Sequence, residues 1–218
     1  MKNPKKLIIY VLRASLIAIT AYLIYQKDFL FAFSAFIASI ISFLPILIKK
    51  NYQFTLPWKI EFMIAVVLLL HILGELFILF DRVFFYSPMM HFLGTFTIAL
   101  LAFIIIYSLN LTKHVKLSIF MIGFFTLMFA MSIGAFWEIG EFASDKTFGT
   151  HAQGDGIDPL DDTMYDLTWD AAAGLVIAII GSSLMKRHHE LVHPFEEYLK
   201  KSRHKKHRPK LKKRFYKK

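Results

Sequence analysis

Two pairs of carboxylates lie at helical spacing at the edges of long apolar stretches of this sequence. Glu138 and Glu141 are three residues apart and Asp166 and Asp170 are four apart, so each pair shares one face of a helix. His91 opens a third apolar stretch. Charged groups are costly inside a membrane and usually mark a functional site there. These residues therefore predict either a divalent-cation site or a group of protonated carboxylates.

The residue types indicate which ions such a site would bind. Carboxylate oxygens suit hard cations such as Mg²⁺, Mn²⁺ or Ca²⁺, which we expect in preference to Zn²⁺, although the histidines leave Zn²⁺ and Fe²⁺ open. The predicted metal ligands are Glu138, Glu141, Asp166, Asp170 and Glu75. One ion cannot bind both Asp162 and Asp170, because eight residues of helix separate them by about 12 Å.

Other polar residues near this cluster are predicted to take part in catalysis or to line the entrance. We expect His91 to act as a general acid or base and Arg82 to contact a phosphate group. Asp155, Asp162 and Gln153 are placed at the entrance to the site. The simpler interpretations are that Asp155 is a solvated loop residue and that Asp162 caps a helix.

The composition requires a membrane around these residues. Of the 218 residues, 56% are hydrophobic and 19% are charged, and the mean hydropathy is +0.49. Such a chain has more apolar surface than one small soluble core can bury, which excludes soluble, disordered and disulfide-framework proteins. The sequence contains no cysteine, so thiolate nucleophiles and zinc–thiolate sites are also excluded.

Six apolar stretches are long enough to cross a bilayer, which takes about 20 residues of α-helix. They are residues 7–25, 29–48, 60–80, 90–109, 117–141 and 164–185. The predicted fold is therefore all-α, a polytopic membrane bundle of six transmembrane helices. We divide the chain into a transmembrane domain, residues 1–185, and a basic tail, residues 186–218. Residues 142–163, rich in Gly and Asp, are expected to form an irregular outer loop.

The positions of the lysines and arginines predict the orientation of the bundle. They are concentrated at both ends and in two of the connections, so both termini are expected in the cytoplasm and the acidic cluster in the outer leaflet of the cell membrane. Arg13, within the first span, is expected to extend to the inner interface. The tail, with 14 basic residues, is expected to bind anionic lipid headgroups. Nucleic acid is the weaker interpretation, because aromatic residues are sparse there.

A longer pattern connects the candidate residues over residues 70–180. It comprises Asp81-Arg82, His91-Phe92, Gly94, Glu138, Glu141, Phe148-Gly149-Thr150, Gln153-Gly154-Asp155 and Asp162-Thr163 with Asp166. This pattern resembles the YjdF-like family of uncharacterised bacterial inner-membrane proteins, in which the last segments are closer together. A more distant likeness is to the VanZ-like group, which also has an acidic helix end before an Asp-containing helix start. The resemblance implies the membrane architecture and the site, and no particular reaction.

Three classes of function fit these observations. The first is a metal-assisted enzyme that acts on a lipid or polyprenyl phosphate, with the ion polarising the phosphoryl group. The alternatives are a non-catalytic membrane protein that binds a lipid or protein partner, and a carrier of divalent cations or protons. A carrier would need polar residues that continue inward, where His71 is the one obvious step, and no pair of broken-helix repeats is present.

Overall fold

The structure, a computed structural model, describes residues 4–52, 56–112, 115–154 and 158–187. These residues form α1 (Pro4–Tyr25), α2 (Phe29–Tyr52), α3 (Trp58–Leu76), α4 (Leu79–Arg82), α5 (Tyr86–Leu111), α6 (Ile119–Phe148) and α7 (Pro159–Arg187). The described residues contain no strand, so the prediction of an all-α fold is confirmed. The basic tail from residue 188 onward, with its expected lipid contacts, lies outside the described residues.

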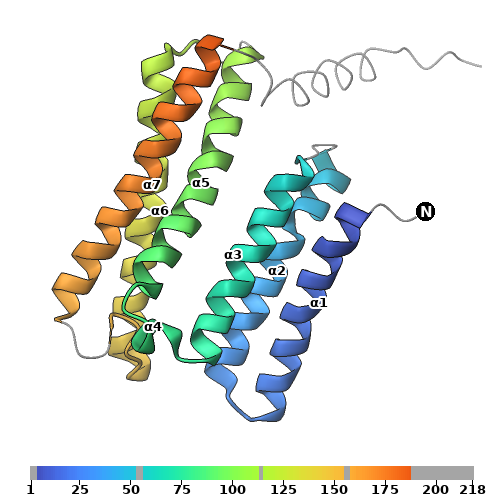
Figure 1. Cartoon of the computed structure of the whole chain (residues 1–218), viewed down its shortest axis with the longest axis vertical. Helices are drawn as coiled ribbons and strands as arrows, with labels where there is room; N and C mark the ends of the chain where they lie inside the picture. Colours follow the sequence, from blue (N-terminus) through green and yellow to red (C-terminus); the bar gives the residue numbers. More distant parts are fainter. Residues whose placement is uncertain (1–3, 53–55, 113–114, 155–157, 188–218) are drawn as a thin grey trace, which may run out of the picture.

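The long helices form two groups of three (Figure 1). Helices α1, α2 and α3 pack against one another, and α5, α6 and α7 do the same. The two groups meet where α3 contacts α5, and the short helix α4 lies at the end where α3 connects to α5. All the residues of the predicted acidic cluster except Glu75 belong to the second group.

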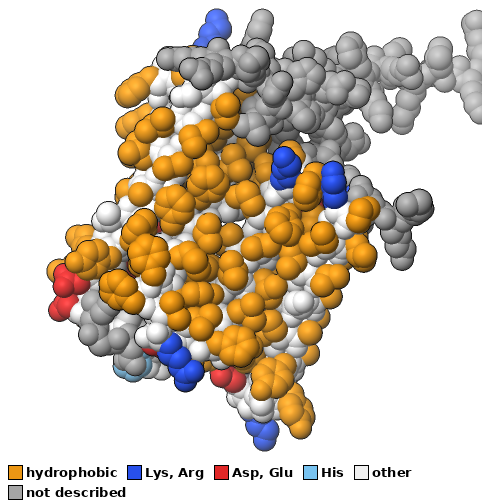
Figure 2. All heavy atoms as spheres, in the orientation of Figure 1, with side chains coloured by type: hydrophobic (Ala, Val, Ile, Leu, Met, Phe, Trp, Pro, Cys, Tyr) orange, Lys and Arg blue, Asp and Glu red, His pale blue; other side chains and the backbone are white. Residues whose placement is uncertain are grey.

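Five of the described helices, α1, α2, α5, α6 and α7, are long and apolar enough to cross a membrane. On the face shown in Figure 2, apolar side chains cover the middle of the molecule, and the charged side chains lie toward its ends. This distribution is what a bilayer requires of a multi-pass protein. The remaining long helix, α3, has 19 residues and includes Lys59, Glu61 and Glu75. Its membrane span, the sixth, stays a prediction.

The span predicted for residues 60–80 is interrupted. Helix α3 ends at Leu76, and Ile78 has a left-handed backbone with φ of 55° before α4 begins. A branched side chain rarely adopts this conformation unless packing imposes it. The ring of Tyr86 packs edge-on against Phe80 at 5.0 Å, and its hydroxyl donates to the carbonyl of Leu70 at 2.6 Å. These contacts fold the connection back on α3, which hydropathy alone does not indicate.

The irregular segment is also shorter than the predicted 142–163. Helix α6 continues to Phe148, and α7 begins at Pro159. Polar residues such as Asp145 and Lys146 end the apolar stretch but are compatible with further helical turns. The helix ends instead at Gly149, whose φ of 67° is the left-handed conformation that glycine adopts readily.

Arg13 is buried in the first helical group, so its expected extension to the interface is wrong. Its Nε donates to the carbonyl of Ser42 at 2.8 Å, and its Nη2 lies 3.4 Å from Oε2 of Glu61. Its guanidinium also lies over the ring of Phe43, 5.2 Å from the centroid. Helices α2 and α3 thus supply the polar partners that a buried arginine needs.

Candidate metal site

Helices α5 and α6 bring three potential metal ligands together. One donor atom each from His91, Glu138 and Glu141 lie within 4.8 Å of one another. Only 8% of the His91 side chain and 4% of Glu138 are exposed. Three such donors can hold one divalent cation. This group is the candidate metal site.

His91 lies at the centre of a wider set of carboxylates. Its Nε2 is 3.6 Å from Oε1 of Glu138 and 3.3 Å from Oδ2 of Asp166. Its Nδ1 is 3.4 Å from Oδ1 of Asp170 on the opposite edge of the ring. Both helical pairs predicted from sequence spacing therefore meet at one imidazole. The expected association of His91, Glu138, Glu141, Asp166 and Asp170 is present in the structure.

Hydroxyl groups on α5 hold the two aspartates in place. Ser87 donates to Asp166 at 2.9 Å, and Thr95 donates to the fully buried Asp170. Ser87 and Thr95 are four residues before and after His91, on the same face of the helix. Sequence reasoning did not identify them, although this spacing was a usable signal.

Several carboxylate oxygens in the cluster are buried without a hydrogen-bond partner among the described residues. These are both oxygens of Glu138, Oε2 of Glu141 and Oδ2 of Asp170. A buried charge without compensation costs several kcal/mol. The cluster therefore needs either protonated carboxyl groups or a balancing positive charge beside the oxygens of Glu138.

The remaining predicted site residues lie at different distances from this group. Asp162 is at the start of α7, mostly buried, against the backbone of Gly154, which has φ of 83°. Gln153 donates from Nε2 to Thr163 at 3.0 Å. Arg82 is exposed on α4. Asp155 lies outside the described residues.

Glu75 lies outside the group formed by His91, Glu138 and Glu141. Its Oε1 accepts a hydrogen bond from Ser34 on α2 at 2.8 Å and lies 3.2 Å from Nε2 of His71. The imidazole of His71 packs edge-on against the indole of Trp137, with centroids 5.1 Å apart. The indole Nε1 then donates to Oε1 of Glu141 at 2.8 Å. Trp137 thus contacts both His71, the partner of Glu75, and Glu141 of the candidate metal site.

Replacing Trp137 with phenylalanine should weaken metal binding about tenfold, because the ring is kept but the hydrogen bond that orients Glu141 is lost. Titration calorimetry with Mn²⁺ on the full-length protein measures this. The matched control is Trp169→Phe, since the described contacts of Trp169 are aromatic packing against Phe85 and Phe92. Equal affinities for the two variants would contradict an orienting role for Trp137.

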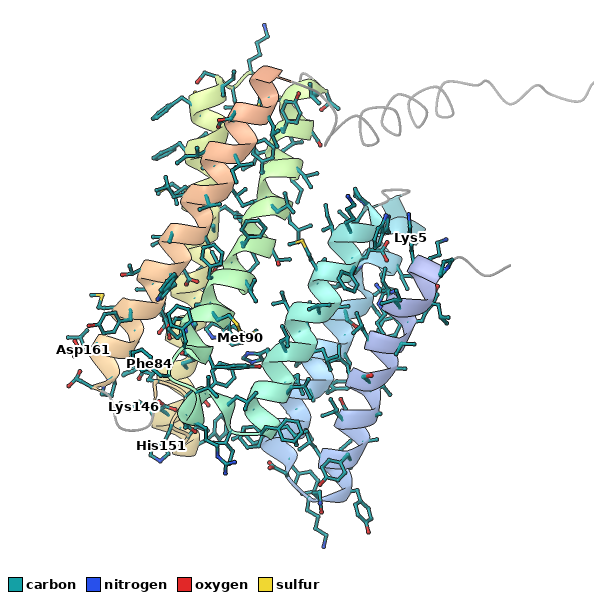
Figure 3. All side chains as sticks on the ribbon, in the orientation of Figure 1. Lys5, Phe84, Met90, Lys146, His151 and Asp161 are labelled. Atoms are coloured by element: carbon teal, nitrogen blue, oxygen red, sulfur yellow. The ribbon has the colours of Figure 1, made fainter. Side chains whose placement is uncertain are left out.

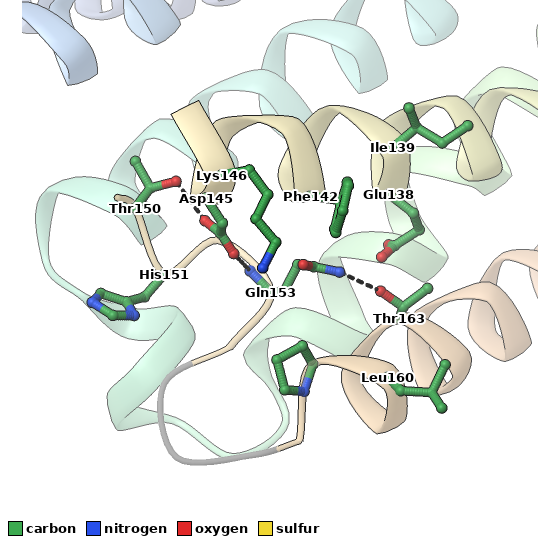
Figure 4. Close-up of a pocket in the computed structure, with 11 residues that line it drawn as sticks. Glu138, Ile139, Phe142, Asp145, Lys146, Thr150, His151, Gln153, Leu160 and Thr163 are labelled. Carbon is green, nitrogen blue, oxygen red and sulfur yellow. Dashed lines mark hydrogen bonds between the residues drawn. The ribbon is translucent and has the colours of Figure 1, made fainter. Parts of the chain in front are cut away.

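A pocket of about 510 Å³ opens beside Glu138, between the end of α6 and the start of α7 (Figure 4). It is lined by Glu138, Ile139, Phe142, Asp145, Lys146, Thr150, His151, Gln153, Pro159, Leu160 and Thr163. Lys146 and His151 lie at the end of the bundle opposite Lys5 (Figure 3). Glu138 therefore belongs to the buried cluster and also lines an open pocket.

Asp145 shapes the wall of this pocket, a role that the sequence analysis missed. Its carboxylate accepts hydrogen bonds from the hydroxyl of Thr150 and from the backbone N–H groups of Ala152 and Gln153, the last two at 2.7 and 3.1 Å. These bonds fold the segment after α6 back on the helix end. Spacing within one helix could not reveal this contact, because it depends on how the loop turns.

Fold and site together define a multi-pass, all-helical membrane protein with a buried histidine–carboxylate cluster beside an open pocket. Residues 7–187 match the family described as "Predicted membrane protein (DUF2238)". The chain belongs to this family. The expected membership of an uncharacterised membrane-protein family is therefore confirmed, and the finer likenesses to the YjdF-like and VanZ-like proteins stay predictions.

This chain is also similar to one protein from a thermophilic bacterium. An "Uncharacterized protein" of Thermotoga maritima is 29% identical over 131 residues, which is 59% of this chain. The aligned part spans 64% of that protein's length. No solved structure matches this chain.

Proposed function

We propose that this protein is a divalent-metal-dependent membrane enzyme that acts on the phosphate group of a lipid or polyprenyl phosphate. We place it in the cytoplasmic membrane with six spans, both termini in the cytoplasm and the site in the outer leaflet. One observation carries the proposal: three donors on α5 and α6 lie within 4.8 Å, and two of them have buried oxygens without a hydrogen-bond partner among the described residues. A divalent cation would satisfy those oxygens and bind an anionic substrate.

The contacts of His91 support a role as a metal ligand rather than as a general acid. Its Nε2 faces Glu138 and Asp166, where the ion would lie. Its Nδ1 faces Asp170, which is held by Thr95. A carboxylate behind a metal-bound imidazole fixes the ring and the protonated nitrogen, and this pairing is common in metal sites. Asp170 would therefore orient His91 rather than bind the ion itself.

The ion would polarise a phosphoryl oxygen and stabilise the charge that develops during transfer or hydrolysis. The residues of the chain would hold the ion and contact the substrate. Glu138 and Glu141 would hold the ion together with His91, and Glu138 also lines the pocket. Apolar residues at the pocket mouth, Ile139 and Phe142, suit the chain of a lipid substrate.

A carrier of cations or protons is less well supported by the interior of the second helical group. A transport path needs polar groups beyond Asp170, toward the other ends of the helices. In the described residues that region is an apolar core formed by Ala99, Phe103, Ile122, Ala130 and Ile177. Among the buried hydroxyls there, those of Thr126 and Ser108 donate to carbonyls within their own helices. This core favours a site open at one end.

Metal content of the full-length protein, purified in detergent, tests the proposal. We expect about one equivalent of Mg, Mn, Ca or Zn in the wild type by inductively coupled plasma mass spectrometry. A Glu138→Gln/Glu141→Gln variant should lose it, because neutral amides are much weaker ligands for these cations. Asp161→Asn is the matched control, since Asp161 is an exposed carboxylate on the first turn of α7.

An ion lost during purification would be detected by thermal shift on adding Mn²⁺, since a ligand that binds the folded state raises its stability. If neither test shows metal binding, the metal-dependent mechanism is wrong. If metal binds, release of phosphate from a polyprenyl phosphate should require the ion and should disappear in the double variant. Metal binding without any turnover of phosphorylated lipids would contradict the enzyme assignment.

A further inference from the structure

Lys146 is the lysine that lines the pocket beside Glu138, and its surroundings leave its charge available. Its Nζ lies over the ring of Phe142, 5.5 Å from the centroid. Among the described residues it forms no ion pair, although Asp145 precedes it directly in the chain. The Asp145 carboxylate accepts instead from Thr150, Ala152 and Gln153. A cation in this position can bind an external anion.

The pocket mouth is apolar on both sides of this lysine. Ile139 and Phe142 on α6 and Leu160 on α7 line the pocket and are each more than half exposed. Figure 4 shows Phe142 and Lys146 on the same stretch of α6, with Leu160 across the cavity. These residues lie on helices that can cross a membrane, so their exposed side chains can contact an alkyl or isoprenoid chain. A small soluble anion would leave this surface uncovered.

We propose that the pocket binds the headgroup of a phosphorylated amphiphile, with Lys146 contacting the phosphate and Ile139, Phe142 and Leu160 contacting the start of its apolar chain. This inference rests on the proposed function, because it names the pocket and the residues that would bind the substrate of the same site. Lys146 takes the role that the sequence analysis gave to Arg82. Helix α4, which carries Arg82, contributes no residue to the pocket lining.

Two residues that line the pocket, Glu138 and Lys146, would together recognise one phosphate group. Glu138 lies at one end, where it belongs to the candidate metal site, and Lys146 lies toward the other (Figure 4). A phosphate between them would contact the ion through one oxygen and the ammonium through another. Gln153, held by its hydrogen bond to Thr163, closes the wall between the two helices.

Direct binding to the full-length protein in detergent tests this inference, with farnesyl phosphate as the probe. Titrations are run with Mn²⁺ and again with EDTA. Lys146→Gln should weaken binding at least tenfold under both conditions, because a hydrogen bond to a charged group is lost. Lys146→Arg should retain most of the affinity. Lys27→Gln, an exposed lysine in the turn between α1 and α2, is the control and should bind like the wild type.

Two further probes separate the phosphate from the chain. Farnesol and inorganic phosphate should each bind far more weakly than farnesyl phosphate. Farnesol binding as tightly would overturn the role of Lys146, and inorganic phosphate binding as tightly would overturn the apolar part of the site.

The EDTA titration distinguishes this inference from the proposed function. If Mn²⁺ has no effect while Lys146→Gln still weakens binding, the metal proposal fails and the amphiphile site stands. If Lys146→Gln binds like the wild type under both conditions, the amphiphile site is wrong whatever the metal does.

Discussion

Gly134→Ala should destabilise the protein by about 3 kcal/mol, a large effect for one added methyl group. Gly134 on α6 packs directly against the side chain of Asp170 on α7, and a Cβ at this position would overlap the carboxylate. The substitution must either push the helices apart or displace Asp170 from Thr95 and His91. Both responses are costly, because the first opens a packed interface and the second leaves a buried charge without partners.

Gly140→Ala is the matched control for this prediction. Gly140 is on the same helix, and a Cβ there meets no atom within 4 Å. Alanine is a better helix former than glycine, so this variant should be unchanged or more stable by up to about 1 kcal/mol. Unfolding in detergent, followed by circular dichroism, compares the two variants. Equal stability would show that α6 and α7 are not as close at Asp170 as described.

Arg13→Met should cost about 3 kcal/mol, because it leaves Glu61 in the first helical group without its cationic partner. The Glu61 side chain is 21% exposed, so water offsets part of the loss. Adding Glu61→Gln should restore part of the stability, since the double variant no longer contains an unpaired charge.

A double-mutant cycle on these two residues isolates their interaction. We expect a coupling of about 1 kcal/mol or more, measured by thermal unfolding of the four proteins in the same detergent. Additive effects would mean that Arg13 is stabilised by the carbonyl of Ser42 and the ring of Phe43 and gains nothing from Glu61.

The sequence predicted the helices and most of the side chains that meet at His91, because both depend on local spacing. Hydropathy identifies the apolar part of each helix, and the helical period places Glu138 with Glu141 and Asp166 with Asp170 on shared faces. The period does not state which neighbour a face meets. For this reason the association of Glu75 with Ser34 on α2 could not be predicted from sequence.

The same limit explains the other differences. Arg13 is buried because a backbone carbonyl on α2 and Glu61 on α3 receive it, and neither contact has a sequence signature. The early end of α3 depends on the packing of Tyr86 against Phe80. The longer α6 and α7 follow from polar turns that extend a helix beyond its apolar part. Tertiary contacts, rather than local propensity, decide the burial of Arg13 and the end of α3.

The apolar core beyond Asp170 gives the candidate site a sidedness. Phe103, Ile122 and Ile177 fill the described interior between the cluster and the far ends of α5, α6 and α7. The pocket beside Glu138 opens on the other side of the cluster, so ions and ligands would exchange with the cluster through its mouth. Substrate and product would share this route, so the product would have to leave before the next substrate could enter. The compartment at the mouth would set metal occupancy, and the other compartment would have no influence on it.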